Sequence, residues 1–385
     1  MTLRANNSPP MLVVLVLIAA ASFAAAAILP WALPLPPSTH IHLALAVGVM
    51  PLIFGAMVHF VPVLTRSASP HAGVKTFPLL ASVAGALAVF SFATASQLYY
   101  FAALLVLAVA AAFSGWIIKR ASAPLAKPHP CLHWYLAAIF CLMLALAAVA
   151  AMAIWPEQRL ALKRLHLHLN TLGFVGLTAI ATLQVLLPTA VGRPDPLAAS
   201  RLRQDLKWAV GGTLLTAVGA AWFKPLSWLG TFLWAAPLFH LGRAWFVLYF
   251  REIRQLHGAA PSLAAALAGF ATALIFGALH AGGVLKTTDT AHAFILAFLF
   301  PLVSGAASQL LPVWARPGPQ AAWHARIRQR LGFAGGLRGA LFVVGGFLLG
   351  TGWRGGWLPA MAALAAFLLL LASTTKIMLN RDGAD

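Results

Sequence analysis

The stretch at residues 40–62, "HIHLALAVGVMPLIFGAMVHFVP", places two histidines at the start of a long apolar segment and a proline at its end. Two later stretches have the same layout, "HLHLNTLGFVGLTAIATLQVLLP" at 166–188 and "TAHAFILAFLFPLVSGAASQLLP" at 290–312. In each of the three, a histidine at the third position precedes the final proline by twenty residues. Apolar segments of about 20 residues are typical of transmembrane helices. The three stretches therefore predict three related membrane spans.

The composition of the whole chain agrees with this interpretation. The 385 residues are 61% hydrophobic and only 9% charged, which excludes an ordinary soluble globular protein. No polar stretch between the apolar segments is long enough for a soluble domain, so we predict an all-α integral membrane protein with one polytopic domain over residues 1–385. The predicted spans, about twelve, are 11–33, 40–62, 76–96, 98–118, 133–155, 166–188, 207–224, 226–249, 264–284, 290–312, 334–352 and 355–378.

The spacing of the three similar stretches predicts an internal repeat. Their third-position histidines, His42, His168 and His292, are 126 and 124 residues apart. With twelve spans, this spacing gives three four-helix pseudo-repeats at about 1–125, 126–255 and 256–385, and the similar helices are the second, sixth and tenth. Internal repeats in membrane proteins usually surround a shared site.

The charges indicate how the chain is oriented. Of the 26 Lys and Arg residues, 19 lie in the termini and in the loops that follow even-numbered spans, six lie on the other side, and Arg243 lies inside a predicted span. This positive-inside asymmetry predicts a bacterial inner-membrane protein with both termini in the cytoplasm. The net charge of +19 is then explained by topology and by contact with membrane lipid, and we expect no nucleic-acid binding.

The three repeated histidines are the first candidates for a functional site. With this orientation, His42, His168 and His292 fall at similar depth in the outer leaflet. An ionisable side chain inside a span is by default a functional hypothesis, and neutral imidazole is a common ligand of metals and haem iron. We therefore predict that these three histidines bind a metal or haem. For any one of them alone, a hydrated histidine at the membrane surface is the alternative.

Helix geometry limits what the paired histidines can do. Residues two apart are about 200° apart around an α-helix, so His40 and His42 point to nearly opposite sides, as do His166 and His168. Each pair therefore serves two sites or has one spare member. Cations next to the sixth span could pair with haem propionates or simply anchor the helix at the interface. The further candidates for cofactor binding are His40, His166, His280, Arg159, Lys163 and Arg164.

These residues resemble the heme-copper oxidase superfamily, whose large subunit has twelve helices in a pseudo-threefold arrangement. The resemblance implies haem b held by His42 and His292, and copper as a second metal at His168 or His166. The stretch that begins at His40 is also similar to the second helix of NnrS-like membrane proteins, which contain haem and copper and are linked to nitric oxide stress. A cytochrome or another respiratory subunit would be the partner.

The sequence also departs from the oxidase pattern. Its seventh predicted span, "LKWAVGGTLLTAVGAAW", has no histidine pair, and Thr290 stands where the family has a second haem-ligating histidine. None of the seven acidic residues falls in the middle of a predicted span. We therefore expect no complete oxygen-reducing centre, and whether the chain is an enzyme at all stays open.

Three classes of function fit these observations. The first is a haem-b-binding protein on a degenerate oxidase-like scaffold that acts in electron transfer, in the nitric oxide response or in haem and copper homeostasis. The alternatives are a membrane transporter of haem or metal, and a non-catalytic assembly or structural subunit of a respiratory complex. A bound chromophore would indicate the first class, substrate flux the second, and a colourless complex with a partner the third.

Overall fold

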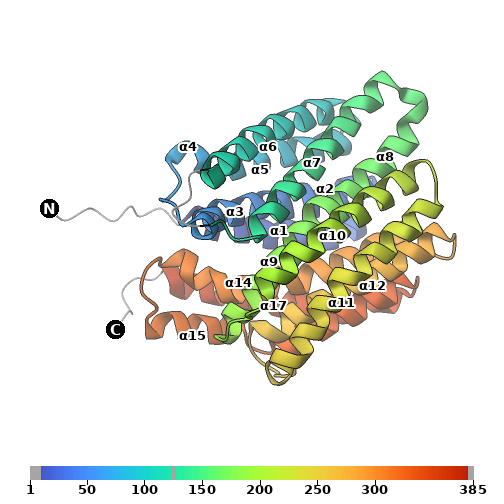
Figure 1. Ribbon diagram of the computed structural model, residues 1–385. Coiled ribbons are helices and arrows are strands. Elements are labelled where there is room, and N and C mark those ends of the chain that lie inside the picture. Colours follow the sequence, from blue (N-terminus) through green and yellow to red (C-terminus); the bar gives the residue numbers. More distant parts are fainter. Residues whose placement is uncertain (1–9, 123–126, 380–385) are drawn as a thin grey trace.

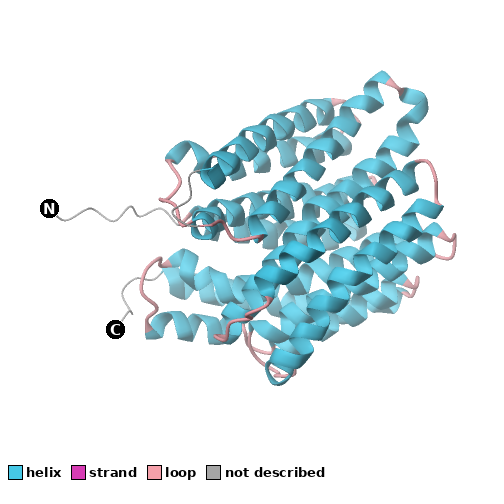
Figure 2. Cartoon of the chain, viewed as in Figure 1, coloured by secondary structure: helices cyan, strands magenta, loops and turns pink. Residues whose placement is uncertain are grey.

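The computed structural model describes residues 10–122 and 127–379, and every regular element in these ranges is helical. Long helices run side by side as a bundle, and short loops join them at its two ends (Figures 1 and 2). In chain order, the longer helices are α1 (Met11–Ala32), α3 (Met50–Thr65), α5 (Phe77–Ala93), α6 (Leu98–Ser122), α7 (Cys131–Ile154), α8 (Arg159–His168), α9 (Thr178–Val191), α10 (Ala198–Ala221), α11 (Pro225–Ile253), α12 (Ala259–Ala281), α14 (Phe300–Ala315), α15 (Ala322–Leu331), α16 (Gly335–Gly350) and α17 (Trp357–Leu379). The shorter α-helices are α2 (Pro37–His42), α4 (Ala72–Lys75) and α13 (Thr287–His292).

The fold class is confirmed at the level of an all-α membrane protein. Within the described ranges, ten helical segments are long and apolar enough to cross a membrane. Two further helices, α10 and α11, are 24 and 29 residues long but are not among these ten. They pack closely against each other. A Cβ added to Gly212 would lie only 2.7 Å from the carbonyl oxygen of Gly230, so the two backbones are in contact there. The predicted span 226–249 lies within α11, whereas the predicted span 207–224 corresponds to α10, which begins nine residues earlier and ends at Ala221.

Each of the three helices with the repeated histidine changes from α to π geometry one residue after that histidine. The π-helices are η1 (Leu43–Val49), η3 (Leu169–Leu177) and η4 (Ala293–Leu299), and an α-helix continues after each of them. π-Helices are rare and are frequently found at functional sites. The three helices are therefore alike in backbone geometry as well as in sequence, at the position of the candidate ligand.

Glycines on neighbouring helices lie directly against two of these π-helices. A Cβ on Gly85 of α5 would overlap the carbonyl group of Ala46 in η1, and one on Gly269 of α12 would overlap that of Ala297 in η4. Since backbone atoms cannot move aside, only glycine fits at these two positions. The neighbouring helices thereby fix the position of the π-helices and of the histidines just before them.

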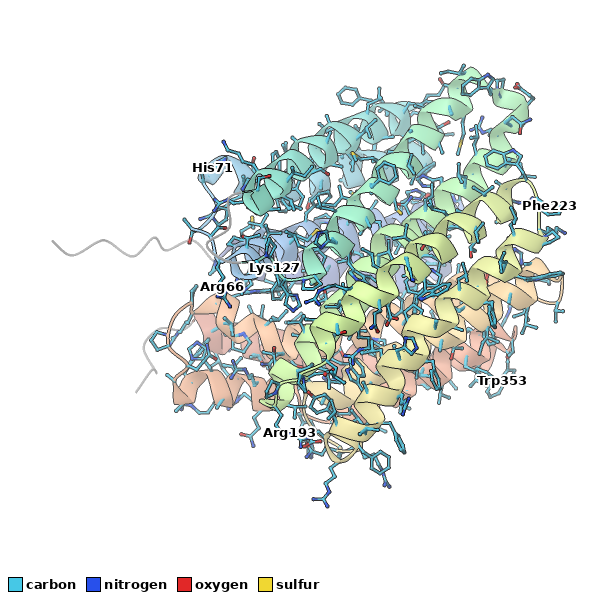
Figure 3. All side chains as sticks on the ribbon, in the orientation of Figure 1. Arg66, His71, Lys127, Arg193, Phe223 and Trp353 are labelled. Atoms are coloured by element: carbon cyan, nitrogen blue, oxygen red, sulfur yellow. The ribbon has the colours of Figure 1, made fainter. Side chains whose placement is uncertain are left out.

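The bundle has two chemically different ends. One end is named here the histidine end. The helices that begin at this end are α2, α6, α8, α11, α13 and α17. The labelled Phe223 and Trp353 lie there, on the right of Figure 3. The opposite end, named here the anchored end, includes the labelled Arg66, Lys127 and Arg193.

The two cysteines are buried between helices in the interior of the bundle. Cys131 and Cys141 both lie on α7, and each is 1% exposed. Cys141 packs against Gly173 of η3, where a Cβ on the glycine would lie 2.5 Å from the cysteine Cβ. The buried thiols are therefore part of the packing around the sixth predicted span.

Candidate cofactor site at the histidine end

The structure brings His42 and His166 together from different predicted repeats. His42 ends α2 and His166 lies in the last turn of α8. Their ring centroids are 6.3 Å apart and the ring planes differ by only 16°. Two imidazoles that share one metal through bonds of about 2 Å place their ring centroids about 6 Å apart. The separation of this pair therefore fits an iron or another metal bound between the two rings.

Hydrogen bonds to the backbone fix the tautomers of both rings. His42 Nδ1 lies 2.7 Å from the carbonyl oxygen of Ser38, and His166 Nδ1 lies 2.9 Å from that of Ala145. Because a carbonyl oxygen can only accept, Nδ1 carries the hydrogen in both rings, and in the neutral ring the lone pair is on Nε2. Metal-ligating histidines commonly donate their other N–H to a carbonyl in this way. Nε2 is therefore the atom of each ring that could bind a metal, and in His166 this atom lies 3.4 Å from the Asn170 amide nitrogen.

A second pair of histidines lies on another side of α8. His168 Nδ1 donates to the carbonyl oxygen of Arg164 at 2.8 Å, and His280 Nδ1 donates to that of Leu285 at the same distance. The two imidazoles are close enough to interact electrostatically. Helix α8 therefore presents His166 to α2 and His168 to α12, as the geometry of an H-x-H pair requires.

The other two candidate histidines have different surroundings. The ring of His292 contacts Trp357 edge-on, with centroids 5.4 Å apart, and interacts electrostatically with Asp289. His40 Nε2 donates to the carbonyl oxygen of Leu35 at 3.3 Å, and its buried Nδ1 has no hydrogen-bond partner within residues 10–122 and 127–379. His40 thus holds a buried acceptor nitrogen that its own surroundings do not satisfy.

The three candidate cations of α8 are exposed at this end of the bundle. Arg159 donates to the hydroxyl of Tyr99 at 3.1 Å. Lys163 interacts electrostatically with His42, and Arg164 does so with His168. Each pair of histidines therefore has a cation beside it that could bind an acidic substituent of a cofactor.

A metal centre with three or more protein ligands has no candidate among the described side chains. In residues 10–122 and 127–379, no three His, Cys, Asp or Glu side chains are grouped so that they could hold a metal ion. A haem needs only two axial ligands on opposite faces. The described side chains therefore fit a haem iron better than a copper held by three histidines.

The structure also shows a buried acidic residue that the sequence interpretation placed outside the spans. Asp205 lies inside α10, its side chain is fully buried, and its Oδ1 is 2.7 Å from His240 Nδ1. Its other oxygen, Oδ2, has no hydrogen-bond partner among the described residues. The prediction missed it because α10 begins at Ala198 rather than near residue 207. Its pairing with His240 depends on how α10 and α11 pack, so the sequence alone gave no signal for it.

Neither a scan against protein-family models nor a search of the curated proteins gives a match for this chain. The chemistry of the site therefore has to be read from its own residues. Two pairs of imidazoles with exposed cations beside them suit a metal-containing cofactor that carries acidic groups.

Proposed function

We propose that this chain is a haem-b-binding membrane protein of electron transfer, on a heme-copper-oxidase-like scaffold of three four-helix repeats. The observation that supports it best is the pair His42 and His166, whose rings are 6.3 Å apart and nearly parallel. Both have Nδ1–H bound to the backbone, which puts the lone pair of the neutral ring on Nε2, and the Asn170 amide nitrogen lies 3.4 Å from Nε2 of His166. A haem supplies one-electron redox chemistry when bound, whereas the protein supplies orientation and electrostatics.

The protein residues have separate roles in this proposal. His42 and His166 would hold the haem iron, and the carbonyl groups of Ser38 and Ala145 fix the tautomers of their rings. Lys163 binds a propionate next to His42. Copper is a second candidate cofactor, with His168 and His280 as ligands that water or a partner would have to complete.

The second axial ligand is the sharpest test of this proposal. The geometry favours His166, whereas the family resemblance favours His292. We expect the purified protein to show a reversible low-spin haem spectrum that His42→Ala and His166→Ala abolish and His292→Ala leaves unchanged. Loss of the spectrum in His292→Ala, with His166→Ala unaffected, would restore the ligand pair of the resemblance. A colourless protein that transports metal across vesicles would replace electron transfer by transport.

The proposal also includes an orientation in the bacterial inner membrane, with both termini cytoplasmic and the histidine end facing outward. It is supported by the excess of Lys and Arg at the anchored end. Reporter fusions after residues 70, 125, 196 and 320 should give cytoplasmic signals, and one near residue 36 a periplasmic signal. The opposite pattern would place the histidine pairs in the inner leaflet.

The proposed electron transfer does not include oxygen reduction. An oxygen-reducing centre needs a high-spin haem with an open position and a copper held by about three histidines. The oxygen electrode should therefore record negligible consumption by the purified chain with artificial donors. Rapid, cyanide-sensitive consumption would show a complete oxidase instead.

A further inference from the structure

A series of contacts between aromatic rings connects His42 with the surface of the histidine end. Phe92, in the last turn of α5, lies 4.6 Å from His42 between ring centroids. Phe92 stacks on Tyr99 of α6 at 5.4 Å with ring planes 13° apart, and Tyr99 contacts Tyr100 at 4.3 Å. Two of the four tyrosines of the chain therefore meet at the surface, in ring contact with a candidate haem ligand.

Three exposed cations of α8 lie at the same end of the bundle as this ring contact, and one of them, Arg159, contacts it directly. Arg159 donates to the Tyr99 hydroxyl, and Lys163 and Arg164 follow on the next turn of α8. All three are exposed, and Glu157 is the acidic residue next to them. These three are half of the cations at this end; the full set is Arg159, Lys163, Arg164, Lys224, Lys286 and Arg354. Positive charge is thus concentrated beside the aromatic rings.

We infer that the face formed by Tyr99, Tyr100, Arg159, Lys163 and Arg164 docks an acidic redox protein, which delivers electrons through Tyr99 and Phe92 to the group held by His42. This inference rests on the proposed haem function. Each step moves one electron from the reduced centre of the partner to the oxidised iron. No bond is formed or broken in the protein, and both tyrosines keep their protons.

Two physical arguments favour this partner. Opposite charges steer a diffusing protein to the right face and raise the association rate. Tyrosine and arginine are also the residues that protein interfaces favour at their centres. Tyrosines at the membrane surface are common in general, but surface placement alone does not explain an unbroken ring contact from Tyr100 to His42.

The docking surface is tested first by binding, which needs no haem. The full-length protein in nanodiscs of zwitterionic lipid is titrated with flavodoxin, an acidic redox protein, at low and high salt. We expect salt-sensitive binding that weakens at least tenfold in the triple variant Arg159→Glu, Lys163→Glu, Arg164→Glu. The matched control reverses the same number of charges at the same end and should bind normally: Lys224→Glu, Lys286→Glu, Arg354→Glu.

The electron route is tested by the rate at which fully reduced flavodoxin reduces the chromophore. Phe92→Leu keeps every surface charge but breaks the ring contact, so it should bind normally and be reduced at least tenfold more slowly. Reduction by dithionite, a small donor that needs no docking, should keep its rate in the same variant.

Each outcome decides the inference. Equal weakening in the triple variant and its control, or in neither, overturns the docking surface. If the triple variant loses binding only to vesicles of phosphatidylglycerol and still binds flavodoxin, the face is a lipid surface and the inference is wrong. A colourless unaltered protein would refute the haem proposal alone, because the binding titration still decides whether the face docks an acidic protein.

Discussion

Histidines at the two ends of the bundle use the same ring atom in opposite ways. At the histidine end, Nδ1 donates its hydrogen to a backbone carbonyl in His42, His166, His168 and His280. At the anchored end, Nδ1 accepts a hydrogen bond from a backbone N–H in His129, His257 and His324. A neutral ring of the second kind has no ligating lone pair left. The comparison separates histidines whose Nδ1 accepts a structural hydrogen bond from those whose lone pair is left on Nε2.

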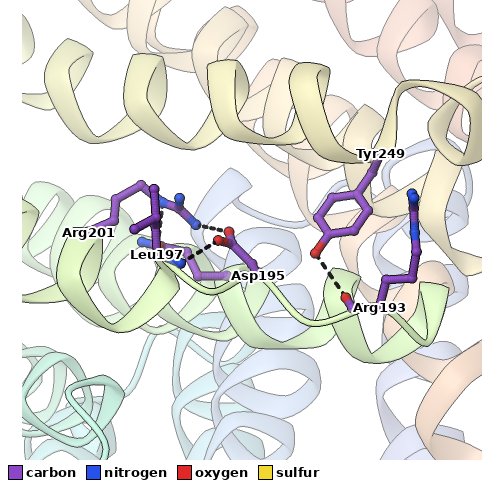
Figure 4. Close-up of polar contacts among 6 residues, drawn as sticks. Arg193, Asp195, Leu197, Arg201 and Tyr249 are labelled. Carbon is purple, nitrogen blue, oxygen red and sulfur yellow. Dashed lines mark hydrogen bonds and ion pairs between the residues drawn. The ribbon is translucent and has the colours of Figure 1, made fainter.

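Other polar groups at the anchored end are also bound within the protein. In the loop between α9 and α10, the Tyr249 hydroxyl donates to the carbonyl oxygen of Arg193 at 2.9 Å, and Arg201 pairs with Asp195 at 2.5 Å (Figure 4). The Leu197 N–H donates to the other oxygen of Asp195. These groups already have partners, so they hold the loop in place and offer nothing to a ligand.

The largest expected effect is that the haem spectrum and the unfolding temperature are affected in different variants. His42→Ala should remove the haem spectrum completely with little change in thermal unfolding. His324→Ala should keep the spectrum but lower the unfolding temperature, because it leaves the Arg316 carbonyl and the Ala321 N–H without their bonds at a cost of about 1–3 kcal/mol. Absorption and unfolding scans of both variants check this. The same phenotype in both would remove the distinction between the two ends.

Deletion of Leu45, one residue within η1, should be nearly as severe. With one residue fewer the segment can return to α geometry, and the widened turn that directly follows His42 and supports its position is lost. The haem spectrum should be lost although the protein still inserts into the membrane. The substitution Leu45→Ala, which keeps the number of residues, should retain the spectrum. If the deletion keeps it too, the π geometry does not position the ligand.

At the anchored end we expect a moderate loss of stability and an unchanged haem spectrum. Arg201→Met leaves the Asp195 carboxylate, 1% exposed, without its counter-charge, which should cost about 3 kcal/mol. Arg203→Met, an exposed position on the same helix, is the control and should change stability little. Chemical unfolding followed by tryptophan fluorescence measures the difference. An unchanged Arg201→Met would mean that this ion pair does not hold the loop.

The smallest effect concerns pH. Burial lowers the pKa of His129, in the loop before α7, below its ordinary value of 6.5, and the nearby Arg203 lowers it further. Since the unfolded chain then binds the proton more readily, the contribution of His129 to stability is present above about pH 6.5 and is lost as the pH falls. The unfolding temperature should therefore drop slightly more between pH 7.5 and 5.5 in the unaltered protein than in His129→Gln. Equal slopes would show that His129 contributes nothing.

The sequence predicted the class of fold and the three helices with the repeated histidine, but not which histidines lie next to each other. Long apolar segments and the repeated histidine–proline spacing were sufficient for the helices. The start of α10 was missed because Arg201, Arg203 and Asp205 look like a loop, although α10 includes them. The π-helices have no sequence signature of their own, and the contact of His42 with His166 depends on how distant helices pack.

The burial of both cysteines has a practical consequence for spectroscopy. Thiol reagents reach only exposed sulfur atoms, and Cys131 and Cys141 are each 1% exposed. A cysteine introduced at Trp353, where the native side chain is 59% exposed, would therefore be labelled selectively in the otherwise unmodified chain. A second label at an exposed position of the anchored end, such as Arg66, would form a pair of spin labels. Distances between the two ends could then be followed while a donor protein binds, without first removing the native thiols.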